Sequence, residues 1–238
     1  QRRRIAATSM SGVCNLGYHR RSSGSAQHRR GCNFDLRVDS TVNTIGNTKG
    51  LTINRLETTL RSYSGKKHEA EGSSPPAAVS VLFNISNGEP CVVMIKRAET
   101  LRHHSGQWAF PGGMIEDSDD SAMHAALRET NEELGISASD IDIWCQIPPV
   151  DTSSGFEIWP YAGRVTDGVK LTPEEAEVAE VVNVPVRVFV EEISKRTITV
   201  VRDGTTRKLT AYAYEDRIIW GASARIIAST IEIVMNAA

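Results

Sequence analysis

The chain has 238 residues, a formal net charge of −2 and 40% hydrophobic residues, which suits one large domain or a domain with an extension. No apolar run approaches the roughly 20 residues of a membrane-spanning helix, so we expect no membrane span. The scattered cysteines Cys14, Cys32, Cys91 and Cys145 lack metal-clip or redox-pair spacing, which favours reduced, unpaired thiols.

The first third of the chain has a charge balance of its own. Residues 1–74 contain 13 Lys+Arg against 5 Asp+Glu, a balance of +8, whereas the remainder has a balance of −10. Arginine pairs and triplets lie among serines before the first acidic residue, Asp35. That stretch lacks hydrophobic periodicity and buries too little apolar surface to fold alone. We therefore predict a basic, low-complexity N-terminal arm over residues 1–74 and a folded domain over residues 75–238.

Two roles for the arm stay open. An Arg-rich, Ser-rich and acid-poor composition is typical of a mitochondrial transit peptide, which predicts a location in the mitochondrial matrix. The chain starts with Gln1 rather than Met, so something has already been removed or omitted. The alternative is that the arm is a docking element of the mature protein. Lys/Arg clusters neutralise RNA phosphates or pair with acidic protein surfaces. The arm could therefore dock the chain to a large mitochondrial protein or ribonucleoprotein complex.

The predicted elements begin after a breaker cluster at Ser73 to Pro76. Strands are predicted at residues 77–85 and 91–97, joined by a hairpin turn at Asn87-Gly88. Further strands are predicted at residues 140–147, 156–165, 180–186, 196–204 and 210–220, with a turn at Asp203-Gly204. Helices are predicted at residues 121–134, 187–193 and 222–236. Mixed strands with few helices indicate an α+β fold, or an α/β/α sandwich with a mixed sheet.

The stretch from Phe110 to Ile136 places three glutamates within five positions, Glu129, Glu132 and Glu133. Like charges three and four apart on a helix repel each other by a few tenths of a kcal/mol per pair. A solvated acidic face is the usual explanation, and a hard cation bound among the carboxylates is the alternative. Oxygen ligands at this density suit Mg²⁺ or Mn²⁺ rather than zinc, with substrate phosphate oxygens completing the shell.

The residues around these glutamates fit a glycine loop followed by a short helix. Gly112 and Gly113 precede the helix, where the backbone can bend sharply and approach a ligand closely. One of three polar residues is expected to cap the helix start, Asp117, Ser118 or Asp119. Gly135 is expected to cap its end. We expect Met123, Leu127 and Leu134 to face the core, and Ala125 and Ala126 to leave room beside the glutamates.

This stretch resembles the Nudix box, which reads Gly, five residues, Glu, seven residues, Arg-Glu-apolar-any-Glu-Glu-any-Gly-apolar. The matching residues are Arg128, Glu129, Glu132, Glu133, Gly135 and Ile136. Thr130 departs from the pattern at an apolar position. Counted back from Arg128, the early glutamate position holds Asp120, one residue further from Gly113 than in the general box.

The segment just upstream resembles the coenzyme A pyrophosphatase branch of the family. Ala98, Arg102, Gly106 and the Phe110-Pro111-Gly112-Gly113 run fall at the spacing of that branch, which also tends to have the longer loop. Two later segments, "IIWGAS" and "VVNVPVRVF", resemble further parts of the branch. The resemblance covers roughly residues 77–236 and does not cover the arm.

The resemblance implies an Mg²⁺- or Mn²⁺-dependent hydrolase that cleaves the diphosphate of coenzyme A or of a related nucleoside diphosphate derivative. It implies metal ligation by Glu129, Glu132 and Glu133, and catalytic roles for Glu132, Glu133 and Arg128. Substrate contacts are implied at four positions: Arg102, Gly106, Gly112 and Gly113. Arg128 is expected to pair with a carboxylate of the box, and the planar fork of Arg102 suits phosphate oxygens.

The remaining candidates have weaker signals. His103 and His104 could touch substrate, although exposed loop histidines are commonplace, and Trp108 is predicted to pack rather than to stack on a base. The run Glu174, Glu175, Glu177 and Glu180 is predicted to be solvated, although a distal carboxylate sometimes joins such sites. A second hypothesis is a Nudix fold used as a structural or RNA-binding subunit. The intact glutamates favour the enzyme.

Overall fold

The computed structural model describes residues 37–39, 50–65, 76–101, 104–152, 155–202 and 205–237, with the backbone alone for 37–39 and 202. The predictions on residues 1–36, on Arg102 and His103, and on the Asp203-Gly204 turn lie outside this set. The roles proposed for the arm and the mitochondrial location stay predictions. Every described residue belongs to one compact unit, residues 33–238.

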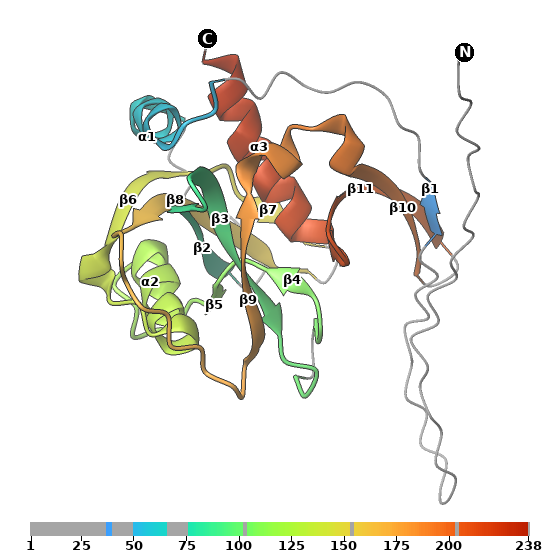
Figure 1. The fold of residues 1–238 in the computed structure, drawn as a ribbon. Helices are drawn as coiled ribbons and strands as arrows, with labels where there is room; N and C mark the ends of the chain where they lie inside the picture. The colour runs from blue at the N-terminus through green and yellow to red at the C-terminus, as the bar shows by residue number, and fades with distance from the viewer. Residues whose placement is uncertain are drawn as a thin grey trace, which may run out of the picture. The chain divides into compact units, whose positions relative to one another are not determined.

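A mixed sheet of eight strands lies at the centre of this unit (Figure 1). Strand β2 (Pro76–Ser86) pairs antiparallel with β3 (Glu89–Arg97) and parallel with β8 (Glu157–Val165). The other strands flank these three: β4 (Trp108–Ala109) and β9 (Val178–Pro185) pair with β3, β5 (Gly112–Met114) pairs with β2, and β6 (Ile141–Gln146) and β7 (Val150–Asp151) pair with β8.

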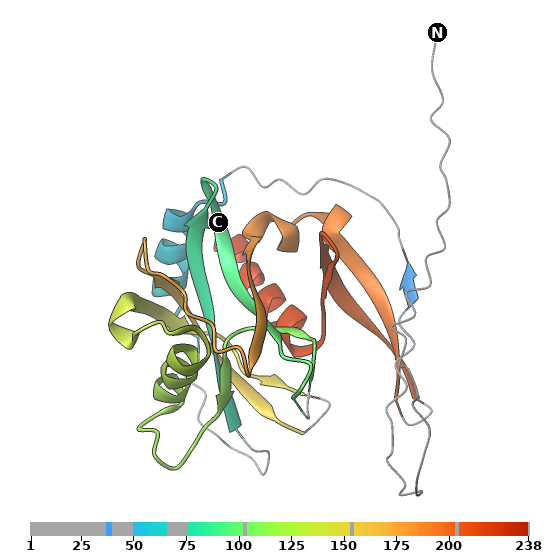
Figure 2. The same ribbon diagram turned by 60° about the horizontal axis from the view of Figure 1, so that its bottom comes forward.

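Helices cover both faces of this sheet (Figures 1 and 2). Alternate residues of β2 point to opposite faces, as the period of a strand requires. Val81 and Phe83 pack in a core shared with α1 (Ile53–Ser62) and α3 (Gly221–Asn236). Ala78 and Leu82 pack on the side of α2 (Ala122–Leu134). The prediction of an α+β fold, a mixed sheet between helices, is confirmed.

A second, antiparallel sheet has the strand order β1-β10-β11-β12. Its strands are β1 (Arg37–Asp39), β10 (Lys195–Arg202), β11 (Thr205–Tyr214) and β12 (Arg217–Ile219). Strand β12 lies against β4 of the central sheet. The single strand predicted for residues 210–220 is wrong, because a turn at Glu215, whose φ is 54°, separates β11 from β12.

The first two predicted strands and the turn between them are confirmed as β2 and β3. Asn87 has a φ of 52° and Gly88 a φ of 78°, which are the two positive angles of a type I′ hairpin. The helix predicted at residues 187–193 is instead two short 3₁₀-helices, η2 (Val186–Phe189) and η3 (Glu192–Ser194). Three β-branched residues, Val186, Val188 and Val190, disfavour a regular helix here. A third 3₁₀-helix, η1 (Ala138–Asp140), follows α2.

Helix α1 was missed by the sequence analysis and lies within the range assigned to the arm. Thr52 caps it by accepting a hydrogen bond from the Arg55 backbone N–H at 3.2 Å. Leu56 and Leu60 are fully buried, in the core that α3 also lines. Arg61 forms an ion pair with Asp142 on β6. The part of the chain that packs into the core therefore starts before residue 75.

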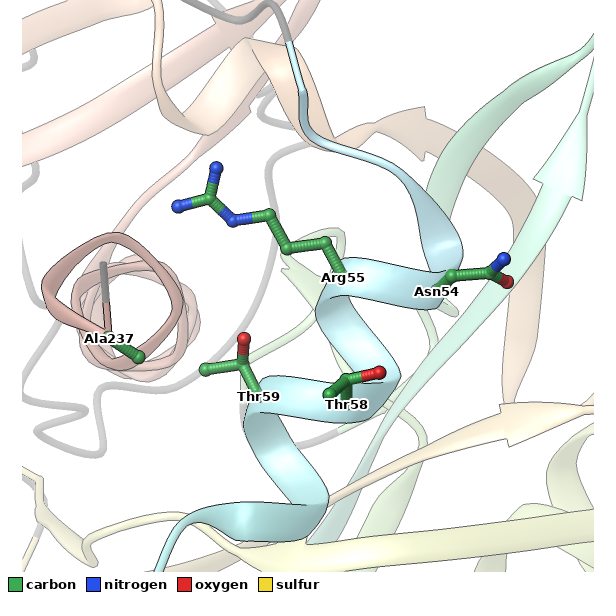
Figure 3. Close-up of a pocket in the computed structure, with 5 residues that line it drawn as sticks. All are labelled: Asn54, Arg55, Thr58, Thr59 and Ala237. Atoms are coloured by element: carbon green, nitrogen blue, oxygen red, sulfur yellow. The ribbon is translucent and has the colours of Figure 1, made fainter.

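A surface hollow lies beside α1 and the end of α3 (Figure 3). It is lined by Asn54, Arg55, Thr58, Thr59 and Ala237. Arg55 and Thr59 point from α1 toward the side of α3 in this view. None of the lining residues belongs to the glutamate-rich stretch, so the hollow is separate from the candidate site. Among the described residues, no helix is long and apolar enough to cross a membrane.

Candidate active site

Helix α2 carries the three glutamates, and its ends are fixed by two residues. Ser121 caps the start, where its hydroxyl accepts a hydrogen bond from the His124 backbone N–H at 3.1 Å. Gly135 ends the helix in the left-handed conformation, with a φ of 67°. The prediction that a residue from Asp117 to Asp119 caps the helix is wrong. The helix boundary at Leu134 and the cap at Gly135 are confirmed.

The buried face of α2 is made of small residues. Ala125, Ala126, Thr130 and Leu134 are buried, whereas Met123 is 40% exposed, so the prediction for Met123 is wrong. The two alanines do not flank open space for the glutamates as expected, because they pack against the central sheet together with Ala78. Small side chains on both partners allow a close approach of the helix to β2.

Thr130, the departure from the Nudix pattern, has a partner that the sequence did not indicate. Its hydroxyl donates to Ser80 Oγ at 2.9 Å and lies 2.7 Å from the Ala126 carbonyl oxygen, which also accepts from Ser80 at 3.1 Å. A buried hydroxyl without a partner would be costly, and this small network satisfies both hydroxyls. At this position, hydrogen bonds to Ser80 and Ala126 thus take the place of the apolar contacts that the Nudix pattern leads one to expect.

Glu133 is the deeply buried glutamate of the three. Its side chain is 1% exposed, and its Oε2 accepts a hydrogen bond from the Gly112 backbone N–H at 2.9 Å. Arg97 Nη1, at the end of β3, lies 3.5 Å from the other oxygen. Desolvation raises the pKa of Glu133 to about 7, although Gly112 and Arg97 act in the opposite direction. The helix therefore presents a carboxyl group that ionises readily only where another positive charge approaches.

Glu129 and Glu132 occupy different environments. The Glu129 carboxylate lies so close to Gly113 that a Cβ there would be 2.4 Å from its carboxyl carbon. Burial raises the pKa of Glu129, and Arg128 partly offsets this. The Glu132 side chain is 56% exposed and lies 3.2 Å from Arg128 Nη1. Gly113 thus lies in direct contact with Glu129, as Gly112 does with Glu133.

Arg128 fixes the loop before the helix. Its Nε and Nη2 donate to the two oxygens of Asp119, both at 3.0 Å, and its Nη1 donates to Glu129 at 3.0 Å. The Asp119 side chain has no exposed surface, and the hydrogen bond from Arg128 lowers its pKa to about 2. His124 Nδ1 lies 3.1 Å from the same carboxylate. Arg128 therefore pairs with a carboxylate of the loop, as expected.

The residue at the early acidic position is Asp119, and the assignment to Asp120 is wrong. Asp120 is exposed, whereas Asp119 is buried under Arg128. Counting forward from Gly113 places five residues before Asp119, as in the general box. The additional residue lies between Asp119 and the helix. Because this additional residue lies between Asp119 and Arg128, the spacing counted back from Arg128 points to Asp120 instead of Asp119.

Two residues that face the cluster were missed or underrated. Arg97 belongs to none of the motifs recognised in the sequence. It is the last residue of β3, and its side chain reaches Glu133. Glu177 is exposed, as predicted for its run, and its charge also raises the pKa of both Glu129 and Glu133. The Glu177 carbonyl oxygen accepts from the Ala98 N–H at 2.8 Å, which fixes the backbone there next to the end of β3.

The other predicted substrate positions are partly described. Gly106 has a φ of 68°, and its N–H donates to the Arg97 carbonyl oxygen at 3.0 Å, so the loop returns beside Arg97. Arg102 lies outside the described residues. His104 is exposed and lies 3.1 Å from the Gln107 amide oxygen. Trp108 is 8% exposed and packs in the core, which confirms its packing role.

The donor set suits a hard divalent cation. Among the described residues, no three His, Cys, Asp or Glu side chains converge as a ready ligand set. Glu129 and Glu132 turn toward Arg128, and Glu133 turns toward Gly112 and Arg97. All the acidic groups here are oxygen donors, and burial raises the pKa of Glu129 and Glu133, so a nearby cation would favour their charged forms. A shared cation would require these glutamate side chains to rotate away from their present partners.

Comparison with known proteins decides the family. Residues 74–203, more than half of the chain, match the family model described as the NUDIX domain. The chain belongs to the Nudix family. Nudix hydrolase NudL of Yersinia enterocolitica is 32% identical over 178 residues, covering 75% of this chain and 91% of the relative. NudL of Photorhabdus laumondii is 34% identical over 150 residues, covering 63% and 80%.

A solved structure of a MutT/nudix family protein from Enterococcus faecalis is similar with a TM-score of 0.45 and 16% identity, covering 72% of this chain and 66% of that one. The family match and the NudL relatives together make this protein a Nudix pyrophosphohydrolase. Nudix hydrolases generally use divalent metal ions such as Mg²⁺, which agrees with the oxygen-rich donor set of the site.

Gly112 and Gly113, predicted to lie in a loop, instead begin strand β5, and they are expected to respond differently to alanine. At Gly112, with a φ of 145°, a Cβ would lie 2.2 Å from the Ala78 carbonyl oxygen, so Gly112→Ala should lower the free energy of unfolding by about 3 kcal/mol. At Gly113 the clash is with the flexible end of Glu129. Gly113→Ala should therefore fold with a loss near 1 kcal/mol while turnover falls. Urea unfolding and turnover of both variants test this, and equal losses of stability would contradict it.

The metal-free protein is expected to lose stability as the pH rises toward neutrality. The folded-state pKa of Glu133 is about 7 against an ordinary 4.5, so the folded protein retains a proton that the unfolded chain releases. The corresponding stabilisation, roughly 3 kcal/mol, is complete below pH 4.5 and is lost as the pH rises through 7. Urea unfolding in a chelator from pH 5 to 8 should show a clearly smaller decline in Glu133→Gln than in wild type, because the pKa of Glu129 is also raised. Parallel curves for the two proteins would contradict the assignment.

Proposed function

We propose that this Nudix protein hydrolyses the diphosphate of coenzyme A, or of a related nucleoside diphosphate derivative, with Mg²⁺ or Mn²⁺. With coenzyme A and one water, the products are 4′-phosphopantetheine and adenosine 3′,5′-bisphosphate. The observation that carries the hydrolase chemistry is the buried Glu133 carboxyl group, which the Gly112 N–H and Arg97 hold beside Glu129. The spacing of Ala98, Arg102, Gly106 and Phe110 to Gly113 supports the choice of coenzyme A.

Each residue has a role that its position allows. We assign Glu129, Glu132 and Glu133 as ligands of the divalent cation, with one of the last two as the base that accepts the proton of the attacking water. A bound cation supplies charge neutralisation at the diphosphate and acidifies water. Arg128 is not in contact with substrate in this scheme and orients Glu129 from the Asp119 anchor.

Positive charge near the diphosphate comes from two arginines. Arg97, now 3.5 Å from Glu133, would be free to contact a phosphate oxygen once a cation neutralises that carboxylate. Arg102 is assigned to a second substrate phosphate on the basis of its spacing alone. Gly106, Gly112 and Gly113 keep the backbone of the two loops close enough to approach the diphosphate.

A substrate panel tests the choice of substrate. The purified chain is incubated with coenzyme A, an acyl thioester of coenzyme A, ADP-ribose and a capped dinucleotide, each with Mg²⁺ and with Mn²⁺, and products are identified by mass. The expected result is the highest kcat/KM for coenzyme A or its thioester, and formation of adenosine 3′,5′-bisphosphate. Equal or better turnover of ADP-ribose or the dinucleotide would remove the coenzyme A assignment and leave the hydrolase class in place.

A further inference from the structure

Three constraints meet at Trp108, two residues before the Phe110-Pro111-Gly112-Gly113 run. The strand ladder pairs Trp108 with Lys96 and Ala109 with Ile95. The Ser223 hydroxyl of α3 donates to the Trp108 carbonyl oxygen at 3.1 Å. The Arg217 guanidinium of β12 lies over the indole ring, with its Cζ 5.3 Å from the ring centroid. Trp108 thus joins the second sheet, through its ring, and α3, through its carbonyl oxygen, to the segment that leads into the site.

Arg217 occupies an unusual electrostatic environment for a surface arginine. Its side chain is only 17% exposed and has three acidic neighbours: Glu180 at 2.5 Å, Glu215, and Asp216 at 3.3 Å. Its Nε atom is buried and has no hydrogen-bond partner among the described residues. The guanidinium also stacks on Trp108, an interaction that gains strength when it is partly desolvated.

The backbone that follows Trp108 is held tightly up to the catalytic cluster. Phe110 is 3% exposed, and the Pro111 carbonyl oxygen accepts from the Ser80 N–H at 2.9 Å. Gly112 is pressed against β2, where a Cβ would meet the Ala78 carbonyl oxygen, and its N–H points at Glu133. These contacts leave the segment between Trp108 and Gly112 little freedom to move. A displacement of Trp108 would therefore be passed on to the hydrogen bond between the Gly112 N–H and Glu133.

From this geometry we propose that Arg217 is a positioning residue for the hydrolase, acting through Trp108 to keep the Gly112 N–H directed at Glu133. The second sheet then has a part in catalysis: its last strand, β12, fixes the catalytic loop from the side of the central sheet opposite to α2. The proposal rests on the hydrolase activity of the family and not on the choice of substrate. Any diphosphate that the wild-type protein hydrolyses can serve as the probe.

The test compares Arg217→Met, Arg217→Lys and Asp216→Asn in the full-length chain. Arg217→Met should lower kcat about tenfold with KM within twofold of wild type, because positioning affects the reacting geometry more than substrate binding. Amide hydrogen exchange of the peptide that contains Gly112 should be faster in this variant, a readout that needs no substrate. Arg217→Lys keeps a cation over the ring and should recover most of kcat. Asp216→Asn, a 90% exposed partner of the same arginine, should match wild type.

A double-mutant cycle with Trp108→Leu separates positioning from general destabilisation. If Arg217 acts through Trp108, the double variant should lose no more kcat than the worse single variant, whereas additive losses would overturn the proposal. A folded Arg217→Met protein with wild-type kcat and wild-type exchange at Gly112 would also overturn it. If Arg217→Met does not fold, the double variant Arg217→Met/Glu180→Gln replaces it, because Glu180→Gln removes one carboxylate that would be left unpaired. Its kcat and its amide exchange at Gly112 are then compared with those of wild type.

Discussion

Replacing Glu133 with glutamine is expected to lower metal-dependent turnover by roughly a thousandfold, because a bound cation supplies several kcal/mol of stabilisation to the diphosphate reaction. The fold should survive. Glutamine has nearly the same shape, and its amide oxygen can still accept the Gly112 N–H that Glu133 now accepts at 2.9 Å. Removing a desolvated carboxyl group from a crowded acidic site should leave the free energy of unfolding unchanged or slightly raised at pH 7.

Glu132→Gln is expected to abolish turnover as well, for a simpler reason. Glu132 is half exposed and free to rotate from Arg128 to a cation, so its contribution is ligation and not packing. Glu175→Gln is the matched control, since Glu175 is an exposed glutamate of the run near Glu177 and should keep wild-type activity. Near-wild-type turnover of Glu132→Gln or Glu133→Gln would show that the glutamate concerned is not a ligand. Unfolding of either variant would show that the cluster is structural.

The second large effect is expected at Arg128. Arg128→Met leaves the Asp119 carboxylate, which the Arg128 side chain covers, without its two-pronged partner, which should cost about 2 kcal/mol of unfolding free energy. The substitution also removes the hydrogen bond that Arg128 donates to Glu129. Turnover per folded molecule should therefore fall as well, in addition to any loss of folded protein. Urea unfolding at pH 7, together with turnover per folded molecule, measures the two effects separately.

The pH dependence and a compensating variant check the cause. The Asp119 pKa is about 2 in the folded protein against an ordinary 3.8, so the stabilisation from this pair is present above pH 3.8 and is lost as the pH falls toward 2. Arg128→Met with Asp119→Asn should regain part of the stability of Arg128→Met, because no charge is then left buried. If Arg128→Met unfolds at the same urea concentration as the wild-type protein, the structural role of the Arg128–Asp119 pair is contradicted.

The position of the glutamates on a helix could be predicted from sequence because the signal is local. Glutamates three and four apart and the glycine that follows them define the helix and its C-terminal end, whereas the cap at its start, Ser121, was not predicted. The orientation of its buried face was harder. Met123 is the larger apolar side chain, yet Ala125 and Ala126 face the sheet, because a helix that lies close to β2 needs small residues at the contact.

The errors at the site arise from loops and from long-range pairing. Asp119 and Asp120 are adjacent acidic residues, and only the burial of one under Arg128 distinguishes them. Arg97 and Glu177 belong to segments that are neighbours because β3 and β9 pair, a contact that spans about 80 residues of sequence. Helix α1 was missed because the composition of the whole basic region outweighed the helical spacing of Ile53, Leu56 and Leu60.

The central claim is that the carboxylates of α2 hold a divalent cation, and Mn²⁺ binding measures this directly. The purified full-length chain is titrated with Mn²⁺ at pH 7.5, and the free ion is followed by electron paramagnetic resonance. We predict saturable binding by wild type and by the Glu175→Gln control, and at least about tenfold weaker binding by a folded Glu133→Gln variant. Equal Mn²⁺ affinity in wild type and Glu133→Gln would contradict the account.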